Sequence, residues 1–330
     1  MLLGGLLSGY AILDGFDLGL GALYLLAKED RDRRILMNAI GPVWDGNEVW
    51  LVTGGGAMFA AFPNVYATVF SGFYIPIILL LVGLIFRAVA IEFRSKHPAR
   101  WWRNSWDIAF SLASIFIAFI MGVALGNIIQ GIPLDQYGEY AGSFFTLINP
   151  YAVLVGISTI SLFMMHGAIY AAMKTEGSIQ EKTRGWINNT IIFFVICFIT
   201  LTMVTLIYLP HMALPFRENP YLFALALLNM LAIANIPREI HHGREFFAFL
   251  SSAFGIAALL GLVAIGIFPN LVISNPNPEY SLNIYNAASS QQTLTNMLII
   301  ALIGLPFVAA YTISIYWIFR GKVKLDASSY

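Results

Sequence analysis

Charged residues are scarce in this chain. Only 11% of its 330 residues are Asp, Glu, Lys or Arg, which is about half of the share typical of a soluble domain. Hydrophobic residues make up 58%, and the mean hydropathy is +0.75. This composition excludes a soluble globular protein and predicts an integral membrane protein. The formal net charge is zero, so nothing in it indicates a nucleic-acid partner.

Cysteine and histidine are rare as well. The single Cys197 excludes an internal disulfide, and its apolar surroundings are typical of an inert buried thiol. Of the five histidines, only His166 lies inside a predicted membrane helix. A protein that holds several haems needs several axial ligands, commonly His or Met, so we expect no haem and no other metal in this chain. We interpret His166 as a hydrogen-bonded packing residue, with a proton relay as the second interpretation.

Motifs of hydrolytic and ATP-driven chemistry are missing too. The sequence has no H-E-x-x-H, no Walker lysine motif and no nucleophile elbow. No basic region precedes the first hydrophobic run, and no small-residue cleavage site follows it, so we expect this run to remain in the mature chain.

Long hydrophobic runs are what the sequence does contain. They reach about 20 residues, the length that an α-helix needs to cross a bilayer, and they lack the alternation of barrel strands. We therefore predict an all-α membrane protein with a single membrane domain over residues 1–330. Nine membrane helices are expected, over residues 2–27, 36–62, 66–93, 104–130, 150–174, 186–209, 219–236, 246–268 and 292–319.

The basic residues predict the orientation of these helices. All but two of the 18 Lys and Arg residues fall after odd-numbered helices or in the C-terminal tail. The exceptions are Arg217, in a loop on the other side, and Arg87, inside the third helix. Because Lys and Arg in short loops stay on the cytoplasmic side, the N-terminus is expected outside and the C-terminus in the cytoplasm. Contact with anionic lipid head groups is sufficient to explain this basic face.

Two carboxylates, Asp14 and Asp17, lie in the middle of the first predicted helix, where charge is costly. Residues three apart share one helix face, and a rise of about 1.5 Å per residue places Asp14 about 16 Å deep. Two ionised carboxylates this close would repel in a low dielectric, so we expect at least one of them to hold a proton. Gly15 and Gly19 let another backbone approach, which favours an acidic face that lies against protein. We predict both acids as proton-pathway residues.

A second acidic pair, Asp45 and Glu48, follows Gly41 and Pro42 in the second predicted helix. Pro42 lacks an N–H group and loosens the helix at this point. Two depths remain open for the pair. It lies in the middle of the membrane if the helix begins near residue 35, and near the cytoplasmic edge if residues 35–42 lie along the interface. In both cases we predict Asp45 and Glu48 as proton-pathway candidates on the helix that follows Asp14.

The next charged residues supply candidate partners for these acids. Arg87 lies inside the third predicted helix, Glu92 and Arg94 lie near its cytoplasmic end, and Asp107 lies one turn into the fourth. We predict Arg87, Glu92 and Arg94 as structural counter-charges and Asp107 as a further proton-pathway candidate. The alternative for Asp107 is an ion pair that only holds helices together.

The order of these motifs resembles subunit II of the cytochrome bd quinol oxidases. The resemblance covers nearly the whole chain and is densest in its first 130 residues. The residues that carry it are Asp14-Gly-Phe-Asp17-Leu-Gly-Leu-Gly21, Arg33-Arg34, Asn38-Ala-Ile-Gly-Pro42, Trp44-Asp45-Gly-Asn-Glu-Val-Trp50, Phe59-Ala-Ala-Phe-Pro63, Ser71-Gly-Phe-Tyr74, Phe86-Arg87, Phe93-Arg94-Ser-Lys96, Gly122-Val-Ala-Leu-Gly-Asn127, Asn149-Pro150, Lys174-Thr-Glu-Gly177, Phe268-Pro269 and Ser289-Ser-Gln-Gln-Thr-Leu294.

The resemblance implies a fold and a reaction. It implies two four-helix bundles plus one peripheral helix, paired with a similarly built subunit I in a pseudo-symmetric heterodimer of the bacterial cytoplasmic membrane. In that family subunit I carries haems b558, b595 and d and the quinol-oxidising loop, and small single-helix subunits join some complexes. The complex oxidises quinol and reduces dioxygen to water with protons taken from the cytoplasm. This chain would be a subunit of that enzyme and not catalytic by itself.

The resemblance also bears on single residues. Asp14, Asp17, Asp45 and Asp107 match acids of subunit II, several of which are proposed to bring protons toward haem d. Glu48 and His166 match positions where some members carry Gln. The helix around Trp50 is apolar and rich in glycine, and it is a candidate border of a dioxygen route. Otherwise Trp50 is a packing residue.

Two other functions also fit the residues. A proton-coupled transporter would use midplane acids and broken helices as well, although no inverted repeat is visible. A scaffold subunit would stabilise the haems of its partner without a proton role.

Overall fold

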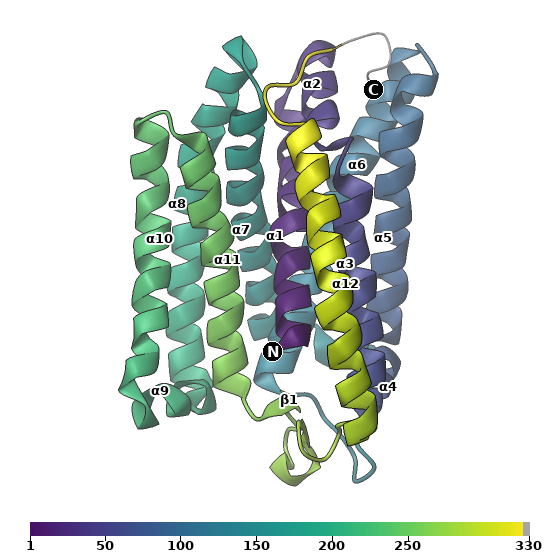
Figure 1. Cartoon of the computed structure of the whole chain (residues 1–330), viewed down its shortest axis with the longest axis vertical. Helices are drawn as coiled ribbons and strands as arrows, with labels where there is room; N and C mark the ends of the chain where they lie inside the picture. The colour runs from purple at the N-terminus through teal and green to yellow at the C-terminus, as the bar shows by residue number, and fades with distance from the viewer. Residues whose placement is uncertain (326–330) are drawn as a thin grey trace.

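The computed structural model describes residues 1–325, most of which lie in long helices that run roughly side by side (Figure 1). The long helices are α1 (Leu2–Leu23), α3 (Trp44–Ala61), α5 (Tyr74–Phe93), α6 (Arg100–Gln130), α7 (Pro150–Lys174), α8 (Gly177–Tyr208), α10 (Phe223–His241), α11 (Glu245–Ile267) and α12 (Gln291–Ile318). The short elements are α2 (Asp30–Ile40), α4 (Pro63–Gly72), α9 (Leu214–Glu218), the 3-10 helices η1 (Tyr24–Leu26), η2 (Arg94–Lys96), η3 (Phe144–Leu147), η4 (Pro210–Ala213), η5 (Pro220–Leu222) and η6 (Pro278–Tyr280), and the antiparallel strands β1 (Asn270–Val272) and β2 (Leu282–Asn283).

The helical class of the prediction is confirmed, and the chain is a membrane protein. Within residues 1–325, eight helices are long and apolar enough to cross a bilayer, where nine were predicted. The predicted second helix, 36–62, is two helices in the structure. It is interrupted at residues 41–43, where Pro42 cannot donate a backbone hydrogen bond. The second of these, α3, has 18 residues, and its acidic first turns make it too polar to meet the same criterion.

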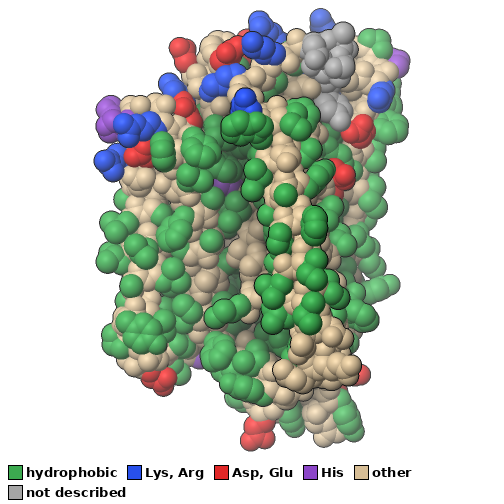
Figure 2. Space-filling view, viewed as in Figure 1, with side chains coloured by type: hydrophobic (Ala, Val, Ile, Leu, Met, Phe, Trp, Pro, Cys, Tyr) green, Lys and Arg blue, Asp and Glu red, His purple; other side chains and the backbone are tan. Residues whose placement is uncertain are grey.

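α1 is the central helix of the arrangement. It packs against α3, α6, α7 and α11, which places its side chains in contact with most of the long helices. Figure 1 shows α7, α8, α10 and α11 on one side of α1 and α3, α5, α6 and α12 on the other. Figure 2 shows that Lys and Arg gather at one end of the helices, the end where α2 and the last described residues lie. We call this end the basic end.

Two glycines set the distance between α1 and α7. A Cβ atom on Gly19 would lie 1.7 Å from the carbonyl oxygen of Phe163, and one on Gly167 would lie 2.3 Å from the backbone nitrogen of Leu20. Both obstacles are backbone atoms that cannot rotate away. The two helices therefore touch backbone to backbone, as small residues allow in membrane proteins.

We expect Gly19→Ala to destabilise the protein through this contact. The added methyl group forces α1 and α7 apart, and overpacking of this kind costs about 1–3 kcal/mol. Thermal unfolding in detergent should show a clearly lower midpoint. Gly5→Ala is the matched control, because Gly5 lies on the same helix and a Cβ atom there meets nothing within 4 Å. Equal midpoints for the two variants would contradict the close approach.

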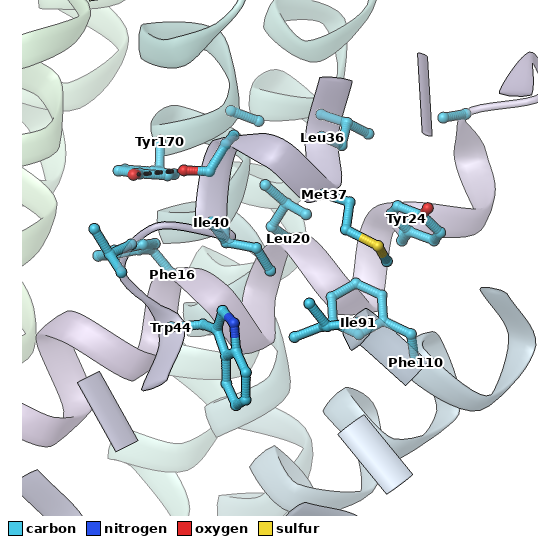
Figure 3. Packing of buried hydrophobic residues seen from close by; sticks show 14 of the residues in the cluster. Phe16, Leu20, Tyr24, Leu36, Met37, Ile40, Trp44, Ile91, Phe110 and Tyr170 are labelled. Atoms are coloured by element: carbon cyan, nitrogen blue, oxygen red, sulfur yellow. Dashed lines mark hydrogen bonds between the residues drawn. The ribbon is translucent and has the colours of Figure 1, made fainter. Parts of the chain in front are cut away.

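A buried apolar cluster fills the space between α1, α2 and the ends of α5 and α6 near the basic end (Figure 3). Leu20 and Tyr24 contribute to it from α1 and η1, and Met37 and Ile40 contribute from α2. The hydroxyl of Tyr170 on α7 donates to the carbonyl oxygen of Ala39 at 3.0 Å, as Figure 3 shows. These contacts hold α2 against the long helices.

Candidate functional site

Three of the predicted residues, Asp14, Glu48 and Arg87, contact one another between α1, α3 and α5. Arg87 of α5 donates from Nη2 to Asp14 Oδ1 at 2.6 Å and to Glu48 Oε1 at 2.5 Å, and from Nε to the same glutamate oxygen at 3.0 Å. Arg87 and Asp14 are fully buried. The hydroxyl of Tyr10, one turn earlier on α1, lies beside Asp14. A guanidinium and two carboxylates from three helices therefore form one charged group, in which Arg87 and Asp14 are buried and Glu48 is partly exposed.

Asp17 lies one turn along α1 from Asp14 and is also buried. Its Oδ2 atom accepts a hydrogen bond of 2.8 Å from Nδ2 of Asn47, while its Oδ1 atom has no hydrogen-bond partner among residues 1–325. Asn47 in turn accepts a hydrogen bond of 3.0 Å from the hydroxyl of Tyr316 on α12. Asp17 thus sits beside the arginine group with a neutral partner of its own.

We call Asp14, Asp17, Glu48 and Arg87 the inner acid cluster. It contains three carboxyl groups and one guanidinium, so one arginine faces up to three negative charges. Burying an ionised carboxylate without a counter-charge is very costly, because little solvent is present to stabilise it. The cluster is neutral overall only if two of its carboxyl groups hold protons.

A second set of charges lies at the basic end. Asp107 accepts from Arg94 Nε at 2.5 Å and from Arg33 at 2.8 Å. Asp30 accepts from Arg94 at 2.7 Å and from Arg103 at 3.2 Å. Partial burial raises the pKa of Asp30, but the bond from Arg94 and the nearby arginine charges outweigh it and hold the pKa below its ordinary value. We call these five residues the basic-end cluster; they tie α2, α5, η2 and α6 together.

Apolar residues separate the two clusters. Arg87 and Arg94 are seven residues apart, a rise of about 10 Å along α5 and η2. Ala90 and Ile91 lie between them and are fully buried, and on α1 the residues beyond Asp17 include Leu20, which is buried in the same apolar cluster. The structure therefore does not bring Asp107, a predicted proton-pathway residue, to Asp14 and Asp17. It surrounds Asp107 with arginines instead.

Asp45 also lies apart from the inner acid cluster. It is exposed in the first turn of α3 and lines a groove of about 290 Å³ between α3 and α12. Trp50 lines the same groove, and a Cβ atom on Gly9 of α1 would lie 2.4 Å from its ring. Trp50 therefore packs on the bare backbone of α1. Glu92 is half-buried near the end of α5.

His166 occupies a buried polar niche on α7. Its Nε2 atom lies 3.0 Å from the carbonyl oxygen of Ile12, and its Nδ1 atom lies 2.7 Å from the hydroxyl of Ser252. The ring stacks on Phe249 at a centroid distance of 4.7 Å. A carbonyl oxygen only accepts, so the bond to Ile12 assigns a proton to Nε2. The Ser252 hydroxyl has one proton, for which Nδ1 competes with the carbonyl oxygen of Phe249 at 2.8 Å. These contacts match the packing interpretation of His166.

The same contacts decide whether His166 is available as a ligand of a haem iron. Both ring nitrogens are already engaged, which leaves neither free for an axial iron bond. No group of three or more His, Cys, Asp or Glu residues within residues 1–325 is arranged to hold a metal ion. The residues around His166 therefore do not fit a haem ligand set.

Two contacts of the site were not predicted. Asn47 was noted only within the motif Trp44–Trp50, although its position one residue before Glu48 indicated that it lies near the acids. Tyr316 lies 269 residues further along the chain, and no sequence pattern connects it with Asn47. Of the two partners of Asp107, Arg94 was predicted as a counter-charge, whereas Arg33 was missed because it belongs to a short amphipathic helix that was expected to be a loop.

Comparison with known proteins agrees with the arrangement. The family model of cytochrome bd terminal oxidase subunit II matches residues 1–319. Subunit 2 of the cytochrome bd-I ubiquinol oxidase of Escherichia coli K12 is 35% identical and covers 99% of this chain and 94% of its own length. Subunit 2 of the Bacillus subtilis cytochrome bd ubiquinol oxidase is 34% identical and covers 97% of this chain and 94% of its own length.

A solved structure shares the fold. A chain of the bd oxidase from Geobacillus thermodenitrificans matches with a TM-score of 0.78 at 17% identity and covers 96% of each chain. With the family match across almost the whole sequence, the chain belongs to the subunit II family of the cytochrome bd terminal oxidases, which are haem-containing oxidoreductase complexes of bacterial membranes.

Proposed function

We propose that this chain is the proton-supplying subunit of a quinol-oxidising terminal oxidase. A haem-bearing subunit I, paired with this chain in a heterodimer, holds haems b558, b595 and d, oxidises quinol and reduces dioxygen to water. Water formation consumes protons at that site. The inner acid cluster takes them up on the way from the cytoplasm. The whole of residues 1–330 acts as one membrane domain in this proposal, in contact with lipid and with any small single-helix subunits.

The observation that carries the proton role is the charge imbalance of the inner acid cluster. Asp14 and Glu48 share Arg87 through direct bonds, while within residues 1–325 the amide of Asn47 is the only hydrogen-bond partner of Asp17. A buried carboxyl group without a counter-charge is more stable when it holds a proton, because its ionised form is poorly solvated. Acids inside a membrane protein commonly mark a proton path. A purely structural ion pair would need only one carboxylate for Arg87.

The orientation of the chain supports uptake from the cytoplasm. Lys and Arg gather at the basic end (Figure 2), and basic residues stay on the cytoplasmic side of a bacterial membrane. In the proposed orientation the basic-end cluster lies at the cytoplasmic surface and the N-terminus of α1 lies outside. With α3 counted as a span, the nine helices form two four-helix bundles and one peripheral helix, for which α12 is our candidate.

The remaining candidates have secondary roles in this proposal. Asp45 collects protons at the surface of the α3–α12 groove, Trp50 borders a dioxygen route, and His166 helps to hold α1, α7 and α11 together. Asp107, Arg94 and Glu92 stabilise the fold near the basic end. A scaffold without a proton role is the competing function, and a stand-alone proton-coupled transporter is the other.

We expect Asp14→Asn and Asp45→Asn to slow quinol-dependent oxygen consumption by the purified complex. Asn keeps the shape of the side chain but cannot hold a proton that it later releases, and losing a proton carrier costs about tenfold or more in rate. Reduced-minus-oxidised spectra of the same preparations should keep the full haem signal, which shows that the complex is assembled.

The competing functions give different results. Wild-type turnover in both variants would reject the proton role and leave the scaffold. Purification of the chain without a haem-bearing partner, with proton-coupled uptake in liposomes, would favour the transporter. Co-purification with a haem-bearing subunit is the result that the oxidase predicts.

A further inference from the structure

The inner acid cluster has no polar connection to the basic end along α1 and α5. Leu20, Ala90 and Ile91 are buried between it and the basic-end cluster. The cluster does lie next to the groove between α3 and α12, because Asn47, the partner of Asp17, is one of the residues that line this groove. The shortest polar way to the buried acids is therefore from the side of the bundle.

Two neutral polar residues form the wall between this groove and Asp17. The hydroxyl of Tyr316 donates to Asn47 Oδ1 at 3.0 Å, and Asn47 Nδ2 donates to Asp17 Oδ2 at 2.8 Å. Asn47 is also held by the carbonyl oxygen of Leu13 on α1, at 3.2 Å. A line of three hydrogen-bonded side chains thus runs from the last long helix to a buried carboxyl group on the first.

The groove continues toward the basic end. A second pocket, of about 430 Å³, is lined by Lys174 and Lys322 and shares Pro42, Val43 and Tyr316 with the groove. The break between α2 and α3 lies at this junction. Asp45, in the first turn of α3, is exposed to the same groove. Charged side chains, among them Lys174, Lys322 and Asp45, therefore line both pockets between the basic end and Tyr316.

The chemistry of the two residues differs. A hydroxyl group donates and accepts, so Tyr316 can also orient a water molecule that enters from the groove, and this water carries the proton to Asp17. An amide only donates through its nitrogen and only accepts through its oxygen, so Asn47 orders the line without carrying the proton itself. The Asp17 Oδ1 atom, buried without a partner among residues 1–325, is the atom left to receive a proton.

We infer that protons reach Asp17 from the side, out of the α3–α12 groove, past Tyr316 and Asn47. This inference rests on the proposed proton role of the inner acid cluster and adds the route by which that cluster is filled. Tyr316 and Asn47 are positioning residues in this route, since the groups that hold the transferred proton are the carboxyl groups. The position of α12 then controls access to the cluster, because Tyr316 belongs to α12.

The test uses the intact oxidase complex with its haem-bearing partner, reconstituted in lipid vesicles. Tyr316→Phe and Asn47→Leu are expected to lower oxygen consumption by about tenfold and to raise the ratio of rates in H₂O and D₂O, because proton delivery becomes limiting. Asn47→Asp should recover most of the rate, since a protonated Asp can donate to Asp17 and accept from Tyr316. Ser314→Ala removes a hydroxyl group from the same helix but not from the lining of the groove, and it should behave like the wild type.

Full haem spectra of each preparation separate lost assembly from slow proton delivery. Wild-type turnover and isotope ratio in both Tyr316→Phe and Asn47→Leu, with slow turnover in Asp17→Asn, would overturn the side route and leave the proposed function intact. Wild-type turnover in Asp17→Asn as well would remove the proton role itself. Slow turnover in Asp107→Asn, with the two groove variants unaffected, would place the route in the basic-end cluster and also overturn the inference.

Discussion

Replacement of Arg87 by methionine is expected to produce the largest loss of stability of any single change considered for this chain. Methionine fills the space of the arginine stem but leaves Asp14 and Glu48 without their shared counter-charge. Breaking a buried ion pair on one side only costs about 3–5 kcal/mol, because the remaining charge keeps its desolvation penalty. Thermal unfolding of the detergent-purified complex should show this loss as a much lower midpoint, together with a smaller yield of assembled protein.

A triple variant separates charge from packing in this prediction. Adding Asp14→Asn and Glu48→Gln to Arg87→Met removes the two unpaired carboxylates, so most of the lost stability should return. Oxygen consumption should stay low in the triple variant, since its proton-holding groups are gone. An unchanged midpoint in the single Arg87→Met variant would show that the buried pairs do not stabilise the protein.

The class of the protein was predictable because it follows from composition and length of hydrophobic runs alone. The acids of α1 were predictable for a related reason. Asp14 and Asp17 share a face by helix geometry, and their cost in an apolar run singles them out. Arg87 was predicted as a counter-charge, but the sequence offered several acids as its partners. Only the packing of α1, α3 and α5 selects Asp14 and Glu48.

The different positions of the two acids in the second pair could not be predicted from the sequence. Asp45 and Glu48 are three residues apart, yet Glu48 binds Arg87 while Asp45 is exposed in the groove. Their difference depends on where α3 begins, and the Gly41–Pro42 break allowed two starting points. The structure starts α3 at Trp44, beyond a separate α2. The bond from Tyr316 to Asn47 joins residues 269 positions apart, which no local pattern predicts.

For Asp107 the contacts favour the alternative role, an ion pair that holds helices together. Its position one turn into a membrane helix suggested a step on a proton path. In the structure it is fully buried between Arg94 and Arg33, with an apolar layer between it and the inner acid cluster. Charge-assisted hydrogen bonds from two arginines, one on α2 and one on η2, join these elements to α6 through Asp107. We therefore propose that Asp107 anchors α2 and α5 to α6.

In our proposal this subunit handles protons, and the haems that handle electrons belong to its partner. The side chains that could exchange protons lie around Asp17, and the histidine that might have held a metal has both ring nitrogens engaged. Substitutions in such a subunit are expected to lower the enzyme's rate by slowing proton delivery, while the haem spectrum stays unchanged. Kinetics that resolve the two processes are the appropriate test.

Proton uptake by the intact complex during a single turnover tests the central claim most directly. Fully reduced complexes with wild-type chain and with Asp17→Asn are mixed with dioxygen, and a pH-sensitive dye follows uptake while absorbance follows haem oxidation. We predict that Asp17→Asn slows uptake at least about tenfold, while electron transfer steps that need no proton keep their rate. Proton uptake at the wild-type rate in a fully assembled Asp17→Asn complex would contradict the proposal that the inner acid cluster supplies protons.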